Sequence, residues 1–67
     1  MTWQRALRRL IARRRYAWLR QRLGVSTAAI NNWVGWINRA GYGCRPGYRM
    51  RRLLIRLAIE DIIKPKE

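Results

Sequence analysis

The chain has 67 residues, of which 16 are Lys or Arg and three are Asp or Glu, giving a formal net charge of +13. This length predicts one small domain, residues 1–67, with a modest core. With no histidine, the single cysteine Cys44 and carboxylates only near the C-terminus, the chain offers no disulfide, no metal-ligand set and no catalytic base. We therefore expect no enzyme, no cofactor and no small-molecule ligand.

The sequence also lacks the features of an exported or membrane protein. Its apolar runs are too short to span a bilayer, and its arginine-rich N-terminus lacks the apolar core of a signal peptide. A lone cysteine suits a reducing compartment. These observations predict a cytoplasmic protein with no membrane partner.

The charges are unevenly distributed along the chain. The three acids, Glu60, Asp61 and Glu67, lie within the last eight residues, so that residues 1–59 contain no acid to pair with an arginine. Arg outnumbers Lys by 14 to 2, and guanidinium groups match phosphates and guanine edges in a bidentate manner. A cationic surface without compensating acids attracts a polyanion and releases its counterions. The charge therefore predicts a nucleic-acid-binding protein.

The first predicted helix covers residues 3–14 and is capped by Thr2. Its inward side is predicted from positions three or four residues apart, namely Trp3, Leu7, Leu10, Ile11 and Arg14. A second helix is expected over residues 16–23, after a basic step at residues 13–15. Gly24 should end it, because glycine readily adopts the left-handed conformation beyond a helix.

Ser26 is the expected cap of a third helix over residues 26–40. Its predicted apolar face comprises Ala29, Ile30, Trp33, Trp36, Ile37 and Ala40. Its predicted polar face comprises Thr27, Ala28, Asn31, Asn32, Gly35, Asn38 and Arg39. A glycine inside a helix is unfavourable by about 1 kcal/mol relative to alanine, so a break at Gly35 is the alternative. Gly41 stands where a helix-terminating glycine belongs.

A loop over residues 42–47 leads to a last helix at about residues 48–63, before Pro65. Its apolar residues occupy more than one stripe. We expect one set to point into the core: Met50, Leu53, Leu54 and Leu57. We expect another to meet a second copy of the chain: Ile55, Ile59 and Ile62. The β-branched run leaves a short strand as an alternative. The pattern as a whole predicts an all-α domain of about four helices.

Residues 16–33, which are 18 of the 67 residues, resemble the helix-turn-helix of phage Cro and repressor proteins and their bacterial relatives. The matching positions are Leu19, Leu23, Gly24, Val25, Ser26, Ile30 and Trp33. The family usually has a small residue, often alanine, where this chain has Arg20. We expect Arg20 to lean out toward solvent or phosphate, or else the angle between the two helices to open.

The resemblance implies a sequence-specific regulator of transcription in a bacterial or phage-infected cell, a Cro-like repressor that occupies an operator in duplex DNA as a homodimer. The second helix of such a motif lies in the major groove. Its base-reading residues would be Ser26, Thr27, Ala28, Asn31 and Asn32, and on a long helix also Asn38 and Arg39. The arginines that flank the motif are the candidates for phosphate contacts: Arg13, Arg14, Arg15, Arg20 and Arg22.

Two other functions compete with this interpretation. The arginine-rich first 23 residues also suit a nonspecific chromosome-binding or RNA-binding protein, and Arg and Trp on amphipathic helices suit anionic lipid surfaces. The turn signals and the asparagine-rich helix face are not features that a lipid binder requires. We expect Trp3, Trp33 and Trp36 to pack in the core rather than to stack on bases, whereas Trp18 projects away from the apolar side of its helix.

Overall fold

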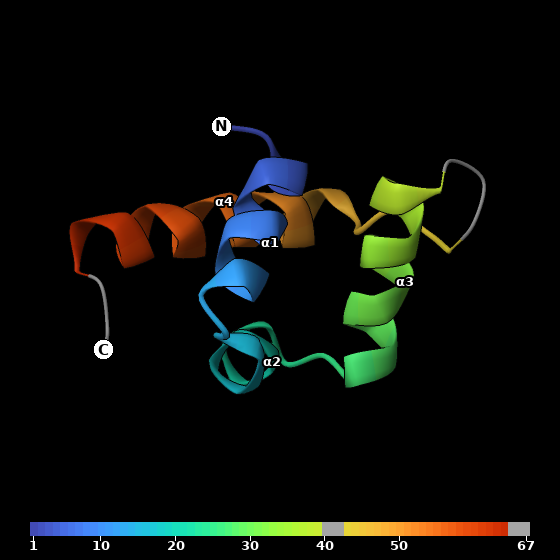
Figure 1. Ribbon diagram of the computed structural model, residues 1–67, viewed down its shortest axis with the longest axis horizontal. Coiled ribbons are helices and arrows are strands. Elements are labelled where there is room, and N and C mark those ends of the chain that lie inside the picture. The colour runs from blue at the N-terminus through green and yellow to red at the C-terminus, as the bar shows by residue number, and fades with distance from the viewer. Residues whose placement is uncertain (40–42, 65–67) are drawn as a thin grey trace.

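The computed structural model describes residues 1–39 and 43–64. This part of the chain forms four α-helices and no strand: α1 (Trp3–Ala12), α2 (Tyr16–Leu23), α3 (Thr27–Asn38) and α4 (Tyr48–Ile63) (Figure 1). The predicted all-α class with four helices is confirmed, and the region considered as a possible strand is the C-terminal half of α4. Helix α3 ends at Asn38, because Arg39 has an extended backbone, so the prediction that this helix continues to Ala40 is wrong; Gly41, its expected cap, lies outside the described residues.

Helix α1 ends two residues earlier than predicted. Its N-terminus agrees with the sequence, since the Thr2 hydroxyl accepts a hydrogen bond of 3.2 Å from the Arg5 N–H. At the other end Arg14 has a left-handed backbone, with φ of 57°. Its N–H bonds to the Ile11 carbonyl, and the Arg15 N–H reaches back to the Leu10 carbonyl. This reversal ends the helix and exposes Arg14, so the prediction that Arg14 belongs to the inward side is wrong.

The connection from α2 to α3 is short and capped on both sides. Gly24 takes the left-handed conformation with φ of 67°, and its N–H bonds to the Arg20 carbonyl. Ser26 is the N-cap of α3, because its hydroxyl accepts a 3.3 Å hydrogen bond from the Ala29 N–H. Both caps were predicted. Helix α3 then continues without a break through Gly35.

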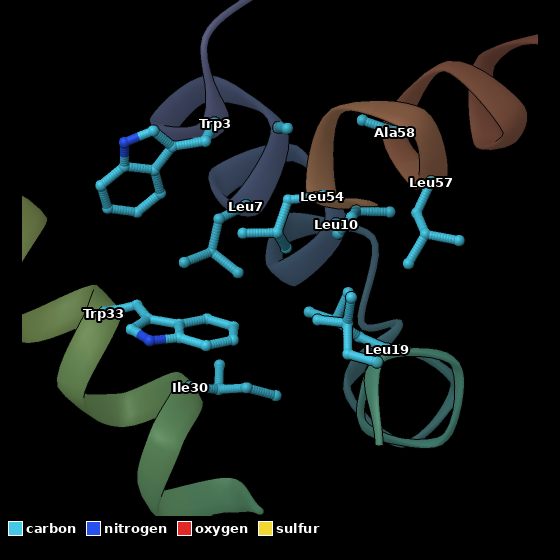
Figure 2. Packing of buried hydrophobic residues seen from close by; sticks show 11 residues of the cluster. Trp3, Leu7, Leu10, Leu19, Ile30, Trp33, Leu54, Leu57 and Ala58 are labelled. Atoms are coloured by element: carbon cyan, nitrogen blue, oxygen red, sulfur yellow. The ribbon is translucent and has the colours of Figure 1, made fainter. Parts of the chain in front are cut away.

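The core lies where residues from all four helices converge (Figure 2). Helix α4 packs most extensively on α1, and α2 packs on both, whereas α3 joins the core mainly through its side chains. From α3 come the buried Ile30 and Trp33, and Trp36 lies in tilted contact with Trp3, with 6.3 Å between their ring centroids. The buried apolar set is Trp3, Ala6, Leu7, Leu10, Leu19, Leu23, Ile30, Trp33, Leu54, Leu57 and Ala58.

Helix α4 extends beyond the other three helices at its C-terminal end (Figure 1). Leu54 and Leu57 are buried as predicted, while Met50, Leu53 and Ile55 are half-buried against the core; three further isoleucines near the end are exposed, Ile59, Ile62 and Ile63. Of the helices in the described ranges, none combines the length and apolar character needed to cross a membrane.

Candidate nucleic-acid interface

The first two turns of α3 expose polar and small side chains to solvent. Thr27, Ala28, Asn31 and Asn32 are all exposed, and buried Ile30 fixes the opposite side of the helix in the core. Their direction therefore follows from core packing. We call these four residues the α3 reading face. Ser26, at its beginning, is also exposed but uses its hydroxyl as the helix cap.

Asn31 is held by a residue of the preceding helix. The Tyr16 hydroxyl donates a hydrogen bond to Asn31 Oδ1, with 2.6 Å between the two oxygens. The carbonyl oxygen of an amide has a second lone pair, and the NH₂ group keeps both donors. Asn31 can therefore contact a base edge while Tyr16 fixes its orientation.

The backbone carbonyl of Asn32 accepts a hydrogen bond from the segment that follows α3. The Cys44 N–H approaches the Asn32 carbonyl at 3.4 Å. Gly43 lies so close that a Cβ there would collide with this carbonyl, and its φ of 72° also disfavours other residues. The side chain of Asn32 nevertheless remains exposed. The returning segment thus supports α3 from one side and leaves the side chain accessible.

Asn38 and Arg39 lie at the other end of α3, roughly 16 Å from Thr27 at 1.5 Å per residue. Asn38 lines a 260 Å³ groove between α1 and α3, whose walls also include Ile11 and Val34. Arg39 follows the helix in extended conformation. Both residues are exposed; Asn38 lies on the same side of the helix as Asn31, about two turns further along, whereas Arg39 is no longer helical.

Two of the arginines predicted to contact phosphate, Arg13 and Arg15, surround a buried aspartate together with Arg9 of α1. The side chain of Asp61 is fully buried, and its oxygens lie 2.7 Å from Arg13 Nε, 3.2 Å from a terminal nitrogen of Arg15 and 3.5 Å from Arg9 Nε. All three contacts are ion pairs, because neither carboxylate oxygen of Asp61 has a partner with hydrogen-bond geometry. This cluster links the end of α4 to α1 and to the turn before α2.

A second acid of α4 engages another predicted phosphate contact. The Glu60 carboxylate accepts two hydrogen bonds from Arg22, at 3.1 and 3.2 Å. The ring of Trp18 contacts both Arg15 and Arg22. Its centroid lies 3.9 Å from the guanidinium carbon of Arg15 and 5.3 Å from that of Arg22. Trp18, which the helical pattern left without a role, therefore connects the two arginines that pair with neighbouring acids of α4.

The remaining two phosphate candidates stand apart from these pairs. Arg14 and Arg20 are exposed, and neither forms an ion pair with an acid in the described part of the chain. Arg20 leans outward, which was one of the two expectations for it. Figure 1 shows that α2 and the first turn of α3 both lie along the lower side of the molecule, so the helix that carries Arg20 is a neighbour of the turn with which the α3 reading face begins.

Sequence reasoning missed the pairing of the two α4 acids with arginines, although a signal was present for Asp61. Asp61 follows Leu54, Leu57 and Ala58 by seven, four and three residues, so all four share one side of a helix. That side is buried. A carboxylate there needs cationic partners, and the run at residues 13–15 could supply them.

Comparison with protein-family models, curated proteins and solved structures gives no match to this chain. Within residues 1–39 and 43–64, no group of three or more His, Cys, Asp or Glu side chains is placed to hold a metal ion. The functional interpretation therefore depends on the α3 reading face and on the distribution of charge.

Proposed function

We propose that this protein is a sequence-specific regulator that binds duplex DNA, with α2 and α3 acting as a helix-turn-helix and α3 entering the major groove. The observation that carries the proposal is the α3 reading face itself. It exposes two asparagines, a threonine and an alanine on a helix that core packing holds in one orientation. The net charge of +13 supplies the long-range attraction to DNA.

The chemistry of these side chains fits a base-reading role. The major groove is about 12 Å wide and admits an α-helix. Asn31 and Asn32 can each form the paired hydrogen bonds that recognise adenine, Thr27 can bond to several bases, and Ala28 can contact a thymine methyl group. Arg14 and Arg20 would hold the phosphate backbone beside the groove. Arg13, Arg15 and Arg22 would have to share their guanidinium groups between phosphates and the acids of α4.

We further propose that the regulator is a homodimer that represses transcription by occupying an operator. Ile59, Ile62 and Ile63 are 44%, 48% and 70% exposed on the projecting end of α4. A second copy would cover this apolar surface and would give two reading helices related by a two-fold axis. Ile55 is half-buried against its own core and would contribute less than predicted.

The DNA-binding proposal is tested by titrating labelled nucleic acids and following their fluorescence anisotropy. Random duplex, single strand, structured RNA and anionic vesicles are compared first, and a preferred duplex is then selected from a random library. Asn32→Ala should weaken the preferred duplex by about 1–3 kcal/mol and leave random duplex almost unchanged. Gln4→Ala, which removes an amide side chain from α1, is the control.

Several outcomes would contradict the proposal. Equal affinity for all nucleic acids would indicate a nonspecific chromosome-binding or RNA-binding protein, and a preference for vesicles would indicate a membrane-active protein. An equal loss by Asn32→Ala on every duplex would remove that residue from base reading. For the dimer, sedimentation of Ile59→Asp should show half the mass of the unmodified protein, and an unchanged mass would refute the interface.

A further inference from the structure

A second basic surface lies on α4. Arg49, Arg52 and Arg56 follow one another at spacings of three and four residues, and all three are exposed. With Tyr48 and Leu53 they line a depression of about 460 Å³. None of the ion pairs in the described residues involves these three arginines. We call them the α4 arginine row.

The α4 arginine row faces away from the core. At 100° per residue, Arg52 and Arg56 each lie about 160° around the helix from buried Leu54. On α3, Asn32 lies about 160° from buried Ile30 by the same reasoning. Figure 2 shows Leu54 and Ile30 entering one core from different helices, and α3 and α4 do not pack closely on each other. The two outward surfaces therefore diverge.

We propose that the α4 arginine row binds the phosphate backbone of a second DNA duplex, so that this protein bridges two duplexes. The inference rests on the proposed function, which places the first duplex at the α3 reading face. A straight duplex bound at the α3 reading face does not reach the α4 arginine row, because the two surfaces face different directions. The row extends over about 10 Å, which corresponds to about three phosphates of one strand at a rise of 3.4 Å each along the duplex axis.

The composition of the row favours backbone binding without base selection. Its polar groups are three guanidiniums and the Tyr48 hydroxyl, and it has no amide side chain of the kind that reads adenine. The row occupies the first three turns of α4, whereas the exposed isoleucines lie in the last two turns. Dimerisation through the isoleucines therefore leaves the row accessible to a duplex.

The test combines two measurements on the full chain. Beads carrying one duplex capture a second, fluorescent duplex, which reports bridging, while anisotropy reports the affinity for a single preferred duplex. Arg52→Gln/Arg56→Gln is compared with Arg5→Gln/Arg8→Gln, which removes the same charge from exposed positions of α1. The row variant should reduce capture about tenfold or more, because two charge-assisted contacts are lost, and its affinity for the preferred duplex should equal that of the control.

Further variants keep the result interpretable. Arg52→Lys/Arg56→Lys retains the charge and should restore most of the capture, which separates binding from a folding defect. Capture equal to that of the control variant would overturn the proposal. A loss of affinity for the single duplex in the row variant alone would also overturn it, because both surfaces would then contact the same DNA. Capture that depends on Ile59 and not on the row would overturn it as well, because the dimer would then be the bridge. Row-dependent capture without sequence preference would refute the proposed regulator and support the bridge.

Discussion

The hydroxyl of Tyr16, the first residue of α2, donates a 2.6 Å hydrogen bond to Asn31 Oδ1 in the second turn of α3. Tyr16→Phe removes this bond and leaves the ring in place. Both residues are at least partly exposed, so the free energy of unfolding should change by less than about 1 kcal/mol. Affinity for the preferred duplex should fall about twofold to tenfold, because Asn31 loses its fixed orientation.

A double-mutant cycle checks this coupling by anisotropy. Tyr16→Phe, Asn31→Ala and the double variant are compared on the preferred duplex, and the double variant should be no weaker than Asn31→Ala alone. If the two effects are additive, Tyr16 does not act through Asn31.

The buried carboxylate of Asp61 should be essential for stability. Asp61→Asn leaves Arg15, whose side chain is 10% exposed, without its buried anion, and breaking a buried ion pair in this way destabilises a protein by about 3–5 kcal/mol. Urea unfolding followed by circular dichroism measures the effect. Glu60→Gln is the control, because its partially exposed pair with Arg22 should contribute less than about 1 kcal/mol. Equal effects of the two substitutions would contradict the central role of Asp61.

Arg14 occupies a backbone conformation that suits glycine. Its φ is 57°, and a left-handed residue other than glycine is unfavourable by roughly 1 kcal/mol. Arg14→Gly should therefore raise the melting temperature, although it removes a charge. Arg14→Ala removes the same charge and keeps the unfavourable conformation, so a rise of equal size in both variants would point to charge repulsion instead.

Gly43 should tolerate substitution less well than Gly24. Both have positive φ, 72° and 67°, but only at Gly43 would a Cβ collide with backbone, the carbonyl of Asn32. Gly24→Ala should destabilise the protein by about 1 kcal/mol through its conformation alone. Gly43→Ala should exceed this loss and should also weaken binding to the preferred duplex, because the segment supports α3. Similar unfolding curves for the two variants would show that the chain relieves the collision by moving.

Local patterns predicted the helices because each boundary residue acts on its immediate neighbours. Thr2, Gly24 and Ser26 cap helices in the structure as the sequence indicated, and Ile30 and Trp33 are buried on the predicted side of α3. The early end of α1 was missed because it depends on Arg14 adopting a conformation that its residue type disfavours. Helical periodicity carries no information about such a reversal.

Contacts between distant residues could not be read in the same way. Asp61 approaches Arg13 across 48 positions of sequence, and Asn31 meets Tyr16 only because Gly24 reverses the chain between them. The sequence identified the candidate reading residues by their type and spacing. It treated the flanking arginines as equivalent, and only the fold separates Arg14 and Arg20 from those that face the acids of α4.

The pairing of Glu60 and Asp61 with arginines of the same chain has a practical consequence. Both acids in the described part of the chain pair with arginines of the same chain. The remaining surface charge of the protein is therefore almost entirely positive. Its self-repulsion opposes the compact state, and any polyanion relieves that repulsion. Heparin or polyphosphate should therefore raise the melting temperature, as DNA should. The identity of the natural ligand will be established by competition among polyanions, because thermal stabilisation alone reports only neutralised charge.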